Sequence, residues 1–299
     1  MIRFSKFTLV GVAILCAASL RLEAQDATAP ADTSYWKKKT EFGANFNQGS
    51  FSTNWAGGGV NSIALGFVFN ALGEYKKGKD SWRNDFQTQY GLVKNRGQES
   101  RKNADRIFFD SKYGRQLTDK WSFIANVNFL SQLAPGYMYS TGPDNREVAK
   151  KISNIFSPAF ITESVGLEYK PVPYFFVSFA PGAVRQTIVA DRQLYVNTPD
   201  QRNYGVPIGR SVRNEVALMQ IVANFDKNIA ENVNLKWRYM MFANYRELNA
   251  IDHRIDAMLT AKVNKYLNVN LGAIVLFDKD QSAAIQFAQT LALGFLYTF

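Results

Sequence analysis

Apolar and polar residues alternate with a period of two along nearly the whole chain after residue 34. The pattern is clearest at the end, where large apolar residues from Ile285 to Phe299 share one face, interrupted by Gln289, and small or polar residues share the other. Successive side chains of a β-strand point to opposite faces, so this alternation predicts strands. It divides the chain into twelve predicted strands: 36–49, 58–76, 81–95, 104–117, 119–133, 157–170, 173–186, 211–226, 232–246, 252–264, 266–278 and 283–299.

Two architectures produce such a pattern, a soluble β-sandwich or barrel and a transmembrane β-barrel. Strand length favours the membrane, because a tilted strand needs about 9–11 residues to cross a bilayer and most predicted strands are at least that long. The connections also alternate between short and long, as in barrels with tight periplasmic turns and extended external loops. The sequence therefore predicts an all-β fold, a transmembrane antiparallel up-and-down barrel of twelve strands. The long connections are expected near 47–58, 95–104, 134–157, 187–211, 246–252 and 278–283.

The first 24 residues have the features of a secretory signal peptide. Arg3 and Lys6 precede the apolar run Phe7–Leu20, and Ala24 supplies a small residue for cleavage. The run is too short to anchor the chain in a bilayer, and a buried core helix is the alternative interpretation. We expect residues 1–24 to be removed, residues 25–34 to form a short periplasmic lead and residues 35–299 to form the barrel.

The last predicted strand carries Phe295, Tyr297 and Phe299 on one face. A terminal aromatic residue on such a strand resembles the signal by which the bacterial outer-membrane assembly machinery recognises its clients. The alternative is a lipid-facing strand that happens to end there. Together with the signal peptide, this end predicts localisation in the outer membrane of a bacterial cell. The expected partners are outer-membrane lipid and, during biogenesis, the barrel-assembly machinery.

Several short stretches spread over residues 35–299 carry a family resemblance. They are Trp55–Gly59 with Asn61, Trp82–Asn84 with Tyr90 and Gly91, Glu168–Pro171, Phe179–Pro181, Thr187–Asp191 with Leu194, Asn244 with Tyr245, Ile251 with Asp252, and Lys262–Leu267. In these stretches the chain resembles an uncharacterised outer-membrane barrel family of the Bacteroidetes, domain of unknown function 3078 (DUF3078). It departs from the family at Phe179–Arg185, which reads FAPGAVR where a run closer to SPLTGK is usual. The resemblance implies the fold and the location, and it supplies no activity and no catalytic residue.

Composition restricts the chemistry. The chain has one His and one Cys, and zinc sites need several such ligands, so neither a metal nor another cofactor is expected. Cys16 lies in the predicted signal peptide. His253 is predicted to lie beside Asp252 in the fifth external loop, without a nucleophile motif nearby. We therefore expect no enzyme activity.

The basic excess raises the possibility of a nucleic-acid partner, but Lys and Arg are scattered with a strand period, which argues against one and favours a charged lumen. Cleavage after Ala24 removes three cations and one acid, which lowers the net charge from +10 to +8. No basic run in the remaining chain is interleaved with stacking aromatics, as nucleic-acid binding would require. The charged residues predicted to point inward form a mixed lining with a cationic bias: Arg83, Asp85, Arg106, Asp110, Lys112, Glu168, Lys170, Lys236, Arg238, Arg254, Asp256 and Lys262.

These features predict a narrow, porin-like channel for small polar or anionic solutes. An alternative is that opposite charges pair across the lumen and fill it, helped by Val216, Leu218 and Val222, which are also predicted to point inward. The protein would then be a non-conducting barrel that acts as a partner or assembly scaffold. The long loops 134–157 and 187–211, or the periplasmic lead, would carry that role. A barrel hydrolase using His253 is the third hypothesis.

Overall fold

The structure is a computed structural model, and its compact unit is Tyr35–Phe299. It describes residues 35–50, 60–197, 203–246, 248, 251–264, 267–280 and 282–298. The predicted signal peptide (1–24), the lead (25–34) and the Trp55–Gly59 stretch lie outside these residues. Within the described ranges, no helix is long and apolar enough to cross a bilayer.

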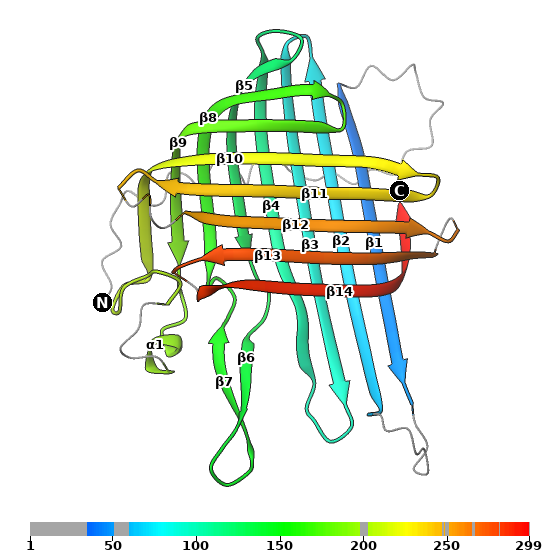
Figure 1. The fold of residues 1–299 in the computed structure, drawn as a ribbon, viewed down its shortest axis with the longest axis vertical. Helices are drawn as coiled ribbons and strands as arrows, with labels where there is room; N and C mark the ends of the chain where they lie inside the picture. The colour runs from blue at the N-terminus through cyan, green and yellow to red at the C-terminus, as the bar shows by residue number, and fades with distance from the viewer. Residues whose placement is uncertain are drawn as a thin grey trace, which may run out of the picture. The chain divides into compact units, whose positions relative to one another are not determined.

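Twelve antiparallel strands close into a barrel (Figure 1). They pair in the order β1-β14-β13-β12-β11-β10-β9-β8-β5-β4-β3-β2. The predicted fold class is therefore confirmed. The bounds are β1 (Trp36–Gly49), β2 (Ser62–Lys77), β3 (Asp80–Asn95), β4 (Arg101–Gln116), β5 (Trp121–Ser131), β8 (Ala159–Val172), β9 (Phe175–Ile188), β10 (Val212–Ala230), β11 (Val233–Asn244), β12 (Asp252–Lys262), β13 (Leu267–Asp278) and β14 (Ser282–Thr298).

Short and long connections alternate around the barrel, as the sequence predicts. One end, which we call the turn end, carries tight connections such as 78–79, 173–174 and 231–232. The opposite end, the loop end, carries the long connections. Gly78 and Asn232 take positive φ angles of 57° and 61° in two of the turns. Tight hairpin turns need such left-handed residues, which Gly and Asn adopt most readily.

The strands are tilted relative to the barrel axis. In Figure 1, strands β1 to β5 run along the vertical axis and β9 to β14 run across them in front. Closing a sheet into a barrel requires such a tilt, so strands on opposite walls must cross. Side chains on the inner faces of the two walls consequently point toward one another.

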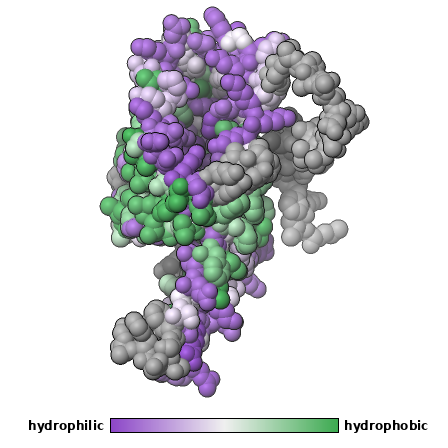
Figure 2. Space-filling model, turned by 90° about the vertical axis from the view of Figure 1, so that its right-hand side faces the viewer, coloured by the Kyte–Doolittle hydropathy of each residue, from purple (hydrophilic) through white to green (hydrophobic). Residues whose placement is uncertain are grey.

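The outer wall is apolar. On β2, Ile63, Leu65 and Phe67 are 44–48% exposed, whereas Gly66 between them is buried. Figure 2 shows the hydrophobic residues gathered in a band with hydrophilic residues on either side of it. Such a band is what a hydrocarbon environment favours. Other exposed apolar side chains of the barrel strands are Phe42, Phe46, Phe123, Val127, Val165, Leu167, Phe179, Leu267, Leu271, Ile285, Phe287, Leu291, Leu293 and Phe295.

Of the three residues of the predicted assembly signal, the structure describes one side chain. Phe295 is exposed on the outer wall. The side chains of Tyr297 and Phe299 lie outside those that the structure describes. The signal itself therefore stays a prediction.

Register shifts interrupt the alternation at several places in the barrel, and two of them change which residues face the lumen. Gly182 pairs with Val165 and Phe179 pairs with Leu167, so β9 carries one extra residue between them. Pro181 fits there because it has no N–H for the sheet. This bulge occupies the run where the sequence departs from the family pattern.

A second register shift lies on β10 between Glu215 and Leu218, and it corrects one prediction. Val216, predicted to point inward, is 48% exposed. Val222, on the far side of the shift, is buried as expected and packs with Met240 and Phe242. The side chain of Leu218 lies outside the described set.

Three elements of the loop end were not predicted. β6 (Gly136–Thr141) and β7 (Glu147–Ser153) form a separate two-stranded sheet, and α1 (Gln193–Asn197) is a short helix in the next long connection. The alternation did not reveal these elements, because the segments that contain them, 134–157 and 187–211, were predicted to be loops. Their segments are short, and contacts with neighbouring loops, described below, hold them in place.

Substitution on the outer wall tests the lipid-facing assignment. Phe67→Arg should lower the free energy of unfolding by about 2–4 kcal/mol, because a charge is placed against hydrocarbon. Phe67→Leu should cost much less, since the wall stays apolar. Denaturant titration of protein folded into lipid vesicles measures both values. Equal losses for the two variants would contradict a position facing lipid.

Candidate functional site

Side chains from opposite walls meet inside the barrel. Arg238 on β11 donates a hydrogen bond of 2.8 Å to Asp110 on β4. These strands are not neighbours, since five steps separate them around the barrel by the shorter route. A contact between them must therefore pass through the lumen, so both side chains point inward.

Further charged side chains join this contact. Lys112 on β4 pairs with Glu168 on β8, and Arg254 donates two hydrogen bonds of 2.7 Å to Asp256 on its own strand, β12. Asp256 is within electrostatic reach of Arg106, although β4 and β12 lie six steps apart and so face each other across the lumen. We call this set the ion-pair layer: Asp85, Arg106, Asp110, Lys112, Glu168, Arg238, Arg254 and Asp256.

The carboxylates of the layer are well supplied with donors. Asp110 is only 6% exposed, and it accepts a second hydrogen bond of 2.8 Å from Asn126. Glu168 is 9% exposed and is held by Lys112. Carboxylates removed from bulk water persist as anions only when such donors compensate for the lost hydration. The carboxylates of the layer therefore have specific hydrogen-bonding partners.

Arg106 differs from its neighbours. Its guanidinium makes no hydrogen bond and no ion pair with any residue in the described part of the chain, and its Nε is buried. The guanidinium carbon lies 4.8 Å from the centre of the Phe108 ring, and that of Arg238 lies 5.4 Å from the same ring. Both arginines thus lie close to one aromatic side chain.

The remaining predicted lumen residues lie nearer the turn end. Arg83 pairs with Glu74 and, at 3.3 Å, with Asp85. Lys170 and Lys262 are exposed and Lys236 is partly exposed. Within the residues that the structure describes, these three lysines make no ion pair. A lumen-lining role for them stays a prediction.

A cavity of about 50 Å³ lies between the ion-pair layer and the loop end. By volume it has room for a few water molecules. Its lining combines apolar and charged side chains, among them Phe108, Leu130, Phe160, Arg185, Phe242 and Arg254. Arg185 donates a 2.8 Å hydrogen bond to Asp252 and lies 4.1 Å from the centre of the Phe242 ring.

Strict alternation misses Arg185 because of the bulge on β9. Ser178 and Ala180, before the bulge, are buried on even-numbered positions, whereas Ala183 and Thr187, after it, are buried on odd-numbered ones. Arg185 therefore shares the inner face only after the register has shifted. Pro181 and Gly182 within a predicted strand are the sequence signal that could have located the shift.

The structure also corrects the placement of His253. This residue lies in β12, paired with Met241 of β11, and not in a loop. Its Nδ1 is 2.9 Å from the hydroxyl of Tyr239. The carboxylate of Asp252 accepts a hydrogen bond from Arg185 and not from the imidazole of His253. Among the described side chains, the polar contact of His253 is therefore with a tyrosine, which offers no nucleophile–base–carboxylate arrangement.

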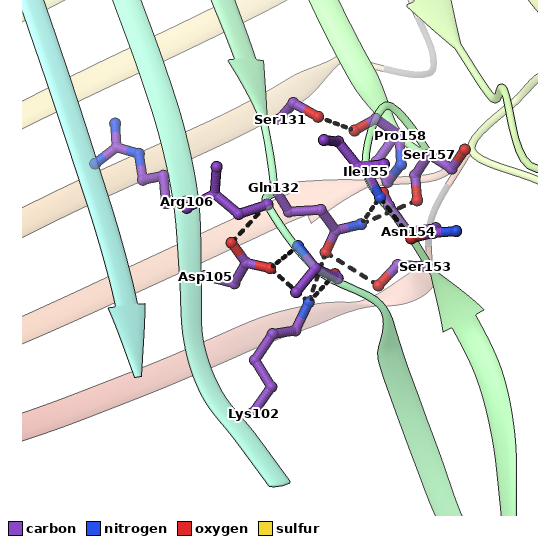
Figure 3. A network of polar contacts seen from close by, with 12 residues as sticks. Lys102, Asp105, Arg106, Ser131, Gln132, Ser153, Asn154, Ile155, Ser157 and Pro158 are labelled. Atoms are coloured by element: carbon purple, nitrogen blue, oxygen red, sulfur yellow. Dashed lines mark hydrogen bonds and ion pairs between the residues drawn. The ribbon is translucent and has the colours of Figure 1, made fainter. Parts of the chain in front are cut away.

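The connection between β5 and β8 is fixed to the barrel rim by polar contacts (Figure 3). Lys102 of β4 donates to Asp105 at 2.8 Å and to the Ala134 carbonyl at 2.7 Å. Asp105 in turn accepts the backbone N–H groups of Leu133 and Ala134. Gln132 donates to the carbonyls of residues 154 and 157, both at 2.9 Å. These contacts hold both ends of the segment that contains β6 and β7.

The connection between β9 and β10 packs against the one between β5 and β8. Asp191 lies 2.7 Å from the ammonium of Lys151 and accepts a hydrogen bond of 2.8 Å from Asn154. Val189, Leu194 and Val206 form a small buried apolar cluster beside them. We call the joined segments 132–158, 189–197 and 203–211 the loop-end cap.

Comparisons with known proteins identify one family model and several solved structures that are similar to the chain. The family model described as "Protein of unknown function (DUF3078)" matches residues 46–137. This match confirms the resemblance to the DUF3078 family. An origin in the Bacteroidetes stays a prediction, and no curated protein sequence matches the chain.

Solved structures that are similar to the chain include the NanC porin, with 8% identity, a TM-score of 0.39, and coverage of 87% of this chain and 98% of that one. The translocator domain of the autotransporter NalP from Neisseria meningitidis has 11% identity and a TM-score of 0.35, with 88% and 87% covered. OccK2 (OpdF) of Pseudomonas aeruginosa, in complex with glucuronate, has 8% identity and a TM-score of 0.28, with 88% and 98% covered.

A double-mutant cycle tests the contact across the lumen. Arg238→Met should lower the free energy of unfolding by about 3 kcal/mol or more, because the buried carboxylate of Asp110 loses its cation. Asp110→Asn should cost less, because Arg238 is partly exposed. The double variant should lose less than the sum of the two. Asp80 and Arg115, a more exposed pair 3.1 Å apart, form the control and should show no measurable coupling. Additive losses at Arg238 and Asp110 would argue against a direct contact.

The loop-end cap should loosen in acid. The hydrogen bond from Lys151 is the main reason why the pKa of Asp191 lies below its ordinary value of 3.8, and burial opposes it. A lowered pKa means that this carboxylate contributes stability above pH 3.8 and loses it as the pH falls through the folded value. Hydrogen exchange at residues 189–194, corrected for intrinsic rates, should therefore accelerate as the pH falls below this value.

The variant Asp191→Asn should show the faster exchange already at neutral pH. Asp144→Asn is the matched control, because Asp144 belongs to a strongly exposed pair with Arg146. Exchange in Asp191→Asn that stays as slow as in the unaltered protein would show that the carboxylate does not hold the cap.

Proposed function

We propose that the protein is an outer-membrane channel that conducts small polar solutes, with a preference for anions, and that the ion-pair layer is its constriction. The observation that carries the proposal is the direct contact between Arg238 and Asp110 from opposite walls. Polar groups meeting across a lumen define a narrow passage with fixed charges, and such charges determine which solutes pass.

Water has partial access to the side chains of the ion-pair layer, which favours a conducting lumen and argues against a filled one. The side chains of Arg238, Arg254 and Asp256 are 18–21% exposed although they lie inside the barrel. Water therefore reaches the ion-pair layer, which a path for polar solutes requires.

The charge distribution supports the preference for anions. The carboxylates of the ion-pair layer are engaged by cationic donors, whereas Lys170, Lys236 and Lys262 near the turn end have no ion-pair partner among the described residues. Arg106 adds a cation without a hydrogen-bonded acceptor at the layer itself. A cationic entrance raises the local concentration of anions and lowers that of cations.

Planar-bilayer recording tests this function. The folded protein should give small single-channel steps, and a salt gradient should give a reversal potential that favours chloride over potassium. Replacing both Arg238 and Asp110 by Ala should raise the conductance severalfold, because the contact across the lumen is removed. The control replaces Asp80 and Arg115 by Ala and should leave the steps unchanged.

Folding of each protein is verified by the shift in electrophoretic mobility between unboiled and boiled samples. Absence of steps from folded protein, unaltered and doubly substituted alike, would favour the non-conducting scaffold. In that case the loop-end cap, where Tyr137, Met138 and Val148 are 45–52% exposed, would be the surface to examine for a partner. Unchanged steps in the double variant would remove the ion-pair layer as the constriction.

A further inference from the structure

Glu163 is a carboxylate on the outer wall of the barrel. On β8 it shares its strand face with Ile161 and with Val165, which is 50% exposed. Its directly opposite neighbours, Val127 on β5 and Val184 on β9, are also aliphatic. Directly paired residues of antiparallel strands share a face, so the exposed side chain of Glu163 projects from an apolar part of the wall that faces lipid.

The side chain of Glu163 makes no hydrogen bond and no ion pair within the described part of the chain. Asp80 and Asp105, on the outer faces of β3 and β4, are instead paired with Arg115 and Lys102. A carboxylate placed against hydrocarbon destabilises a barrel, because acyl chains offer it neither a donor nor water. Glu163 therefore indicates contact with something other than acyl chains.

Two amides lie beside this carboxylate on the same wall. Gln186 on β9 is opposite Ile161, and Asn214 on β10 is opposite Gln186. Asn214 is exposed and Gln186 is partly exposed, and neither side chain makes a hydrogen bond with the rest of the described chain. Gln186 is a diagonal neighbour of Glu163, and such neighbours are about 7–8 Å apart. We call Glu163, Gln186 and Asn214 the polar patch of the outer wall.

The polar patch is complementary to itself. A carboxylate only accepts hydrogen bonds, whereas the NH₂ group of an amide donates two. In a dimer with a two-fold axis along the membrane normal, both copies use the same surface and each contact is made twice. Such an axis keeps every group at its own depth in the membrane, so neighbouring positions on one wall can meet across it. The aliphatic side chains around the patch, which are 40–50% exposed, would then replace acyl chains for one another: Val127, Val165, Leu167, Val212 and Val216.

We propose that the outer wall formed by β8, β9 and β10 is an interface with a second copy of this chain, in which Glu163 of each copy accepts hydrogen bonds from Gln186 and Asn214 of the other. The occupant is a second copy because the polar patch supplies both halves of the contact. The inference concerns the outer wall, and it does not depend on conduction through the lumen.

Sedimentation equilibrium of the folded protein, in detergent micelles matched in density to the solvent, tests the interface. The protein should be a dimer that dissociates as the ratio of protein to detergent is lowered. Glu163→Leu should weaken dimerisation about tenfold or more, because the contact is lost twice while the wall stays apolar. Gln186→Leu should weaken it as well. Glu163→Gln should retain part of the affinity, because a neutral amide still accepts a hydrogen bond.

Gln289→Leu is the matched control. Gln289 is exposed on the outer face of β14 between Phe287 and Leu291, and β14 lies five steps from β9 around the barrel. The substitution also removes an amide from the wall that faces lipid, but far from the polar patch, and it should leave the dissociation constant unchanged. The mobility shift on boiling verifies that each variant is folded.

Any of three results would overturn the interface: a folded protein that stays monomeric at every ratio, a dimer that Glu163→Leu does not weaken, or equal weakening by Gln289→Leu. A monomer would leave a lipid headgroup or a different protein as the partner of Glu163. A trimer would also reject the proposal, because its contacts join two different surfaces and not one surface to itself.

Discussion

Backbone hydrogen bonding is the constraint on which the rest of this structure depends. In hydrocarbon an unpaired N–H or C=O group costs several kcal/mol, so a sheet placed there must close on itself. Twelve strands meet this requirement by pairing in a ring, from β1 through β14 back to β2. Because closure pairs the backbone groups, the lipid and the lumen select only the side chains, which are apolar on the outer face and polar on the inner face.

Closure also determines what the inner face can do. A closed barrel requires tilted strands, and tilted strands on opposite walls cross. β4 and β11 thus present Asp110 and Arg238 to each other across the lumen. The polar interior is therefore a set of specific pairs with one arginine, Arg106, left without a hydrogen-bonded acceptor among the described residues. Selectivity for a solute is proposed to come from that imbalance.

The sequence predicted the structure correctly where the alternation of apolar and polar residues continues without interruption. Alternation located all twelve barrel strands to within a few residues, and loop length distinguished the two ends of the barrel. It was wrong where the repeat breaks: the bulge at Pro181 moved Arg185 to the inner face, and the shift on β10 moved Val216 to the outer one. It also placed His253 in a loop, because strand ends depend on neighbouring strands.

The sequence by itself determined the class of fold and which residues lie on a common face, because a period of two is a local property of the backbone. Only the tertiary structure decided which charged residues meet. Arg238 and Asp110 are 128 positions apart, and their contact depends on strand order, tilt and bulges that no single segment encodes. The joining of Lys151 with Asp191 in the loop-end cap was decided in the same way, by two loops that the sequence pattern treats as independent.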